Sequence, residues 1–267
     1  MIVINTQTFR RASLLVVTIW ALFLLSLWAL VLRGAVVPRT RQAKYFQDRV
    51  RLSFLTDAGC ARVISLIAKD SAQDETFDGA FDVWAQPVPS EQFGLGSGTV
   101  RVGHFAQGSL EPGLVDEQSK ININAASQET LSRLFKSCAN LEDDQAKIIA
   151  QSIVDWRDQD DVANEFGAED GWYRSGVLGQ SYFCKNSAFE TVEELLLVRG
   201  VTPRGLESVF DFVTVYGDGR VNINTAPRQV LESLGLSAET VRRILSVRDG
   251  LDSQAGTQDD KVFETVE

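Results

Sequence analysis

LLVVTIWALFLLSLWALVL, residues 14–32, is a run of 19 residues without a charged side chain. An α-helix rises about 1.5 Å per residue, so this run spans close to the roughly 30 Å hydrocarbon core of a bilayer. Its polar residues are Thr18 and Ser26, which do not form the polar face of a helix that packs on a soluble core. A cleaved signal peptide has a shorter apolar run, of about 7–15 residues, and here Arg33 follows at once. The sequence therefore predicts a transmembrane helix over residues 14–32.

Charge is unevenly distributed along the chain. The 267 residues contain 26 Lys and Arg and 36 Asp and Glu, a net charge of −10. Residues 1–44 hold six basic residues and no acidic residue, so the remainder carries 20 basic and 36 acidic groups, a net charge of −16. A body this acidic repels nucleic-acid phosphate unless it has a basic patch. The basic residues flank the apolar run on both sides and do not settle its orientation by themselves.

The cysteines give no sign of a zinc site. Cys60, Cys138 and Cys184 lack CxxC and CxxH spacing. A Cys138–Cys184 disulfide with one free thiol and three free cysteines are both compatible with the sequence. With 44% hydrophobic and 23% charged residues, the composition is that of a folded protein.

The chain beyond the apolar run shows both helical and strand-like patterns. Apolar residues at three- and four-residue steps predict an amphipathic helix over residues 42–68. Alternating apolar and polar residues predict a strand over residues 98–105, with residues 113–123 as its hairpin partner. Further helices are predicted over residues 141–156 and 193–199, and further strands over residues 213–216 and 220–223.

Two short motifs occur twice. ININAASQETL begins at residue 121 and VNINTAPRQVL at residue 221, and FETVE begins at residue 189 and again at residue 263. An Asn side chain often accepts a hydrogen bond from the first turn of a helix. The interpretation is therefore that the motif asparagines are helix caps and turn formers, not ligand contacts. The asparagines concerned are Asn122, Asn124, Asn222 and Asn224.

An acidic segment, DWRDQDDVANEFGAED, occupies residues 155–170. Carboxylates crowded into a glycine-containing loop suit Ca²⁺ better than a transition metal. The segment is not an EF-hand, because Val162 and Ala163 stand where that loop needs a polar ligand and a glycine. The segment is therefore interpreted either as a weak calcium site or as a solvated acidic loop, and the sequence does not decide between the two. The candidate ligands are Asp158, Asp160, Asp161, Glu169 and Asp170.

The sequence offers no catalytic arrangement. His104 is the one histidine, and no nucleophile, base and oxyanion donors occur together. The glycine-rich run at residues 94–98 precedes a strand and not a helix, so it lacks the geometry of a phosphate-binding loop. No catalytic residue is predicted, and the protein is expected not to be an enzyme.

Several segments together carry a resemblance to a known family. They are the basic and apolar segment at residues 10–32, LSFLTDAG at 52–59, DEQSKININAA at 116–126, DWRDQDD at 155–161, GAEDGWY at 167–173, LLLVRGV at 195–201 and VYGDGRVNINTAP at 215–227. With these segments the chain resembles the minor pseudopilin K family of type II (general) secretion systems. The likeness extends over nearly the whole chain in order, which makes it more specific than any one motif.

This resemblance implies an α+β fold, with a pilin-like long N-terminal helix packed on a small antiparallel sheet. An all-helical domain, of the helix-hairpin-helix or SAM-like type, is inserted into it. The implied boundaries are a cytoplasmic leader at residues 1–13, the transmembrane helix at 14–32, a pilin-like domain at 36–120 and 206–267, and the inserted domain at 121–205.

The resemblance also implies a function. Such proteins support assembly at the tip of a periplasmic pseudopilus together with minor pseudopilins I and J, and they assist protein export across the outer membrane. The chain is then expected to cross the bacterial inner membrane once, with its body in the periplasm, near secreted substrate or the outer-membrane secretin. Family members bind calcium, and a prepilin peptidase trims their N-terminus. The cut would fall between Ala12 and Ser13, where the family has a glycine before the cut.

The alternative is a membrane-tethered helix-hairpin-helix protein of DNA uptake. Such hairpins hold phosphate through the backbone amides of a Gly-x-Gly turn and nearby basic side chains. Residues 137–140 and 235–237 lack that turn and lie in acidic surroundings. The sequence therefore favours the secretion interpretation, with no nucleic-acid partner.

Overall fold

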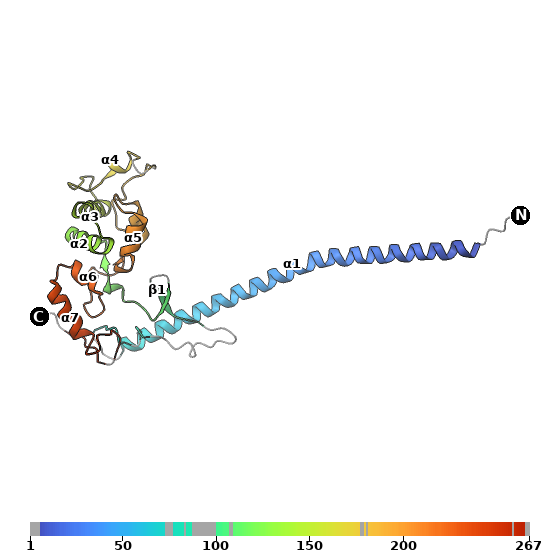
Figure 1. Ribbon diagram of the computed structural model, residues 1–267, viewed down its shortest axis with the longest axis horizontal. Coiled ribbons are helices and arrows are strands. Elements are labelled where there is room, and N and C mark those ends of the chain that lie inside the picture. The colour runs from blue at the N-terminus through green and yellow to red at the C-terminus, as the bar shows by residue number, and fades with distance from the viewer. Residues whose placement is uncertain are drawn as a thin grey trace. The chain divides into compact units, whose positions relative to one another are not determined.

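The computed structural model describes residues 6–72, 77–82, 84–86, 100–106, 109–176, 179, 181–257 and 259–264, with the side chains of residues 6–13 and 35–38 left out (Figure 1). It divides into two compact units. The N-terminal unit contains the described residues up to Cys60, and the C-terminal unit contains those from Ala61 onward. Long and short helices accompany two small sheets, so the predicted α+β class is confirmed.

Helix α1, Thr6–Ser71, is 66 residues long. It includes both the predicted transmembrane helix and the predicted helix over residues 42–68, and it continues without a break between them. The side chains from Leu14 to Leu32 are exposed. In the described part of the chain, α1 is the one helix that is long and apolar enough to cross a membrane by length and composition, with a mean hydropathy of 2.6 in its apolar window.

Four short strands lie in the C-terminal unit. β1 (Gly103–Ala106) pairs antiparallel with β2 (Ser109–Pro112). β3 (Ile121–Asn122) pairs parallel with β4 (Val213–Thr214). The predicted pairing of residues 98–105 with 113–123 is therefore wrong. Gly113, at φ +96°, follows β2 directly, and residues 121–122 find their partner about 90 positions away. The predicted strand over residues 220–223 is irregular backbone.

The helices of the C-terminal unit are short. They are α2 (Gln128–Ala139), α3 (Asp143–Arg157), α4 (Asp170–Tyr173), α5 (Pro203–Val209), α6 (Arg228–Ser233) and α7 (Ala238–Arg248). Three 3₁₀ turns accompany them, η2 (Glu117–Ser119), η3 (Val192–Leu197) and η4 (Phe210–Phe212), and η3 stands where a helix is predicted over residues 193–199. Ser127 and Ser237 cap α2 and α7 by accepting hydrogen bonds from the backbone N–H of Thr130 and Thr240. Helix α2 packs against α3, α5 and α6.

The motif asparagines do not cap helices, so that part of their predicted role is wrong. Asn122 and Asn222 do form turns as predicted, because each accepts at Oδ1 a hydrogen bond from the backbone N–H two residues later. Asn124 and Asn224 hold distant backbone. Asn124 Nδ2 donates to the carbonyl of Phe189 at 3.0 Å, and the N–H of Phe189 donates to Asn124 Oδ1 at 2.7 Å. Asn224 makes the same pair of hydrogen bonds with Phe263, at 3.2 and 2.8 Å. The two repeated motifs are thus partners, because each Asn motif grips the first residue of one FETVE segment.

An arginine closes each copy of this arrangement, and it is partly buried at Arg157 and buried at Arg248. Arg157, the last residue of α3, donates to the carbonyls of Ile123 and Ala126. Arg248, the last residue of α7, donates to the carbonyls of Ile223 and Ala226. Helix pairs α2–α3 and α6–α7 are therefore two copies of one unit, and α2 packs against α6 between them.

One hydrophobic core joins the two copies. Leu131, Phe135 and Ile153 of the first copy belong to the same buried cluster as Leu231 and Val241 of the second. The predicted domain boundary at residues 205 and 206 does not coincide with a break in this core.

Candidate metal centre

Three of the five predicted ligands meet at the end of α3. Asp158 is the C-cap of that helix, and the chain then runs without regular structure to α4. Asp158, Asp160 and Glu169 each bring one carboxylate oxygen to a common place, where these oxygens lie within 4.8 Å of one another. These three residues are called the ligand cluster below.

The other two predicted ligands are engaged elsewhere. Asp161 Oδ1 accepts a hydrogen bond from Asn186 Nδ2 at 2.9 Å. Asp170 Oδ1 accepts one from the backbone N–H of Cys184 at 2.8 Å. Both carboxylates therefore fix the segment around residues 184–186 beside the loop, and the structure does not bring them into the ligand cluster.

Glu169 is the central residue of the cluster. It is 5% exposed, and neither of its carboxylate oxygens has a hydrogen-bond partner of ordinary geometry. Burial above all, together with the charges of Asp155 and Asp158, raises its pKa to about 7, although the adjacent Cys184 thiol, a weak donor, acts to lower it. Oδ1 of Asp158 is also buried without a partner.

Buried, unpaired acceptors fit a bound cation. Leaving such groups uncompensated is costly, and burial of a charge without a partner costs most. A hard cation with oxygen ligands, Ca²⁺ above all, would compensate Asp158, Asp160 and Glu169 together and would keep their carboxylates ionised. The residues present thus match the chemistry of a calcium site.

The loop that carries the cluster is held firmly on α3. Asp155, fully buried, accepts hydrogen bonds from the backbone and side chain of Asn164. Gly167 lies so close that a Cβ there would stand 1.8 Å from Asp155 Oδ2. Arg199 donates to the carbonyl of Gly167 at 2.7 Å. Asp155 therefore positions the loop instead of joining the cluster.

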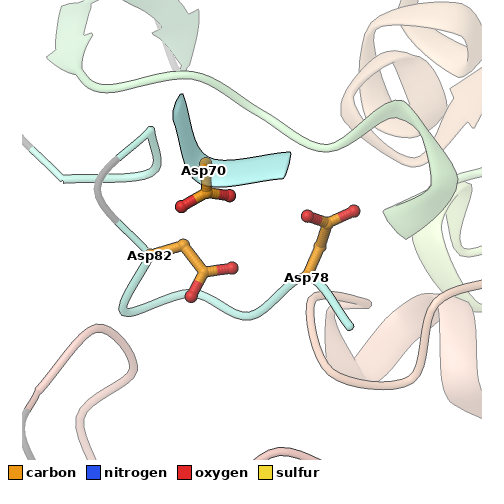
Figure 2. A group of neighbouring side chains, drawn as sticks. All are labelled: Asp70, Asp78 and Asp82. Carbon is orange, nitrogen blue, oxygen red and sulfur yellow. The ribbon is translucent and has the colours of Figure 1, made fainter. Parts of the chain in front are cut away.

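A second acidic group was not predicted from the sequence. Asp70, at the end of α1, faces Asp78 and Asp82 across a common space, and one oxygen of each lies within 4.8 Å of the others (Figure 2). Burial raises the pKa of Asp78, as do the charges of Asp116 and Asp82. Oδ2 of Asp82 already accepts a hydrogen bond from the N–H of Gly79 at 2.7 Å. No motif spacing links these residues, so sequence reasoning had no signal for them.

The structure also bears on the three cysteines and on the predicted cleavage position. Cys60, Cys138 and Cys184 are all free, so the disulfide alternative is wrong. Burial raises the pKa of the Cys184 thiol to about 12, which makes it unreactive. Ala12 and Ser13 lie within α1 among the residues whose side chains are not described, and cleavage between them stays a prediction.

The part of the chain that contains the ligand cluster is similar to a known family. Residues 112–218 match the family model of protein K of the type II secretion system. The predicted resemblance to this minor pseudopilin family is thereby confirmed. A search of curated proteins finds no match.

The protein shares its fold with a solved structure. It is similar to a chain in the crystal structure of the GspK-GspI-GspJ complex from the type 2 secretion system of enterotoxigenic Escherichia coli. The two chains are 20% identical, with a TM-score of 0.56, over 73% of this chain and 69% of the other. At this identity the likeness concerns the fold.

Proposed function

We propose that this protein is a protein K of the type II secretion system, a tip subunit of the pseudopilus that assembles with minor pseudopilins I and J. The match over residues 112–218 carries the proposal. The fold of a chain that is solved together with GspI and GspJ supports the partners. Its activity is binding in pseudopilus assembly and export, not catalysis.

The same proposal places residues 14–32 in the inner membrane and the acidic body in the periplasm. Exposed apolar side chains along this part of α1 support a lipid environment, because water does not favour so continuous an apolar surface. A subunit anchored in this way is accessible to prepilin peptidase at its N-terminus. Its body is free to meet secreted substrate or the secretin.

Co-expression tests the proposed assembly. Tagged full-length protein, expressed with minor pseudopilins I and J of the same genome and extracted in detergent, is expected to retain both through affinity purification and gel filtration. A matched control fuses residues 1–41 to an unrelated periplasmic protein and is expected to retain neither. Recovery of the full-length protein alone, while I and J are present and folded, would contradict the proposal.

We also propose that the ligand cluster binds Ca²⁺. The support is the set of buried, unpartnered oxygens on Asp158 and Glu169, next to the carboxylate of Asp160. Asp161 and Asp170 then support the site by holding the neighbouring segment. Few charged ligands on a surface loop correspond to a weak, extracellular-type affinity, with a Kd of about 10⁻⁴–10⁻³ M.

Calcium is expected to stabilise the protein against heat. At 10 mM, about 10–100 times this Kd, linkage gives roughly 1.4–2.7 kcal/mol. For a protein of this size, that raises Tm by about 3–10 °C relative to excess chelator. Differential scanning fluorimetry of the full chain in detergent measures the shift.

Substitutions identify the residues responsible for the shift. Glu169→Gln removes the buried carboxylate and is expected to abolish it. Glu165→Gln removes an exposed carboxylate from the same loop and is expected to keep it. Equal Tm values with calcium and with chelator in the unmodified protein would rule the site out.

A further inference from the structure

Asn186 has an unusual conformation beside the ligand cluster. Its φ is +47°, in the left-handed region that few residues other than glycine adopt. Nδ2 donates to Asp161 Oδ1 at 2.9 Å and to the carbonyl of Asp160 at 3.3 Å. Because both partners are acceptors, the NH₂ group must face them, and the orientation of the amide is fixed.

That orientation leaves Asn186 Oδ1 buried without a hydrogen-bond partner. In the described part of the chain, six buried side-chain atoms lack partners, and four of them belong to Asp158, Glu169 and Asn186. All four are acceptor oxygens. A water molecule donates to at most two acceptors at a time, whereas one Ca²⁺ ion takes six to eight oxygen ligands.

The segment around Asn186 borders the cluster at other points as well. Residues 181–187, called the strap below, have no helix or strand. The backbone N–H of Cys184 donates to Asp170 Oδ1, and the Cys184 thiol contacts the carbonyl of Asp155 at 3.8 Å and lies beside Glu169. The strap therefore lies against the ligand cluster from a separate stretch of the chain.

We propose that Asn186 is a fourth side-chain ligand of the ion held by Asp158, Asp160 and Glu169, so that the ion ties the strap to the loop that follows α3. The inference rests on the calcium site proposed above. An amide oxygen is an ordinary Ca²⁺ ligand and adds no charge to the three carboxylates. In this backbone conformation the NH₂ group of Asn186 donates to Asp160 and Asp161 in the loop, and Oδ1 remains available as a ligand for the ion.

The consequence concerns the surface that the strap carries. Phe183 is 66% exposed, and the guanidinium of Arg174 lies over its ring at 5.1 Å from the centroid. With the ion bound, the strap is tied to the loop that follows α3, and this tie also restrains the exposed ring of Phe183. Without it, the strap loses this tie and keeps its hydrogen bonds to Asp161, Asp170 and other residues, so its backbone opens to solvent more often.

Two measurements on the full chain in detergent test the inference. The first is Ca²⁺ affinity by isothermal titration calorimetry with calcium chloride. Asn186→Gly keeps the left-handed backbone but removes the oxygen, and it is expected to weaken Ca²⁺ binding at least tenfold. The matched control is Asn140→Gly, at an exposed asparagine with a φ of +51° after α2, which is expected to leave the affinity unchanged.

The second measurement is hydrogen–deuterium exchange of residues 181–187. Calcium is expected to slow exchange there in the unmodified protein and in Asn140→Gly, but not in Asn186→Gly. If Asn186→Gly binds calcium like the unmodified protein while Glu169→Gln does not, the ligand role of Asn186 is wrong and the calcium site stands. If the unmodified protein binds no calcium, both proposals are overturned.

Discussion

A variant with Leu24→Arg and Leu25→Arg is expected to leave the membrane, whereas the unmodified protein is recovered with membranes and resists alkaline carbonate. Each arginine at the centre of a spanning helix costs about 2.5–3.5 kcal/mol on insertion scales, so two cost roughly 6 kcal/mol. Helix α1 has 66 residues and is about 100 Å long, three times the thickness of the hydrocarbon core. Only a part of it can therefore lie in lipid, and residues 14–32 are the uncharged part.

A control pair of substitutions tests whether the effect depends on the position along α1 or only on placing arginine at an exposed apolar residue. Leu24 and Leu25 are 56% and 64% exposed, while Leu52 and Phe54 on the same helix are 63% and 70% exposed. Leu52→Arg with Phe54→Arg introduces the same two charges outside the proposed span and is expected to leave the protein in the membrane fraction. Membrane retention of the Leu24 and Leu25 variant, or loss of both variants, would contradict an anchor at residues 14–32.

Replacement of Arg157 by Met is expected to destabilise the C-terminal unit strongly. The guanidinium donates to the carbonyls of Ile123 and Ala126 in the first Asn motif. Methionine keeps the aliphatic length but leaves both carbonyls without a donor. Hydrogen bonds to a charged group contribute about 1.5–3 kcal/mol each, so a loss of roughly 3–5 kcal/mol is expected. That corresponds to a fall in Tm of about 6–15 °C.

The internal duplication supplies the comparison. Arg248→Met removes the equivalent contacts of the second copy, to Ile223 and Ala226, and is expected to have an effect of similar size. Arg243→Met changes an exposed arginine of α7 and is expected to stay within about 0.5 kcal/mol of the unmodified protein. Thermal unfolding followed by circular dichroism compares the three. An Arg157→Met protein as stable as Arg243→Met would show that these hydrogen bonds contribute little.

The parts of the fold that depend on local composition were predictable. An uncharged run of 19 residues specifies a long apolar helix whatever surrounds it, and α1 includes it. The apolar spacing of residues 141–156 specified α3 almost to the residue. The repeated Asn motifs were recognisable as a duplication. Their role was not, because the groups that Asn124 binds belong to Phe189, 65 positions later, and no local pattern encodes that distance.

The candidate site was partly predictable for the same reason. Asp158, Asp160 and Glu169 lie close in sequence and stood out as a crowd of carboxylates. Asp161 and Asp170 instead accept hydrogen bonds from Asn186 and Cys184. The positions of these donors depend on the tertiary structure, so the local sequence could not show that the two carboxylates are engaged elsewhere. Asn186 carries no charge and follows a segment of mixed polar and aromatic residues, so nothing in its sequence context marked it as a candidate ligand.

The two copies of the helix pair differ in how much chain their closing contacts enclose. Asn124 grips Phe189 across 65 positions, while Asn224 grips Phe263 across 39. The entropy lost on closing a loop grows with the logarithm of its length, so the second closure is less costly by about 0.5 kcal/mol. In the released full-length chain, the closing contact of the second copy is therefore expected to form about twice as readily as that of the first.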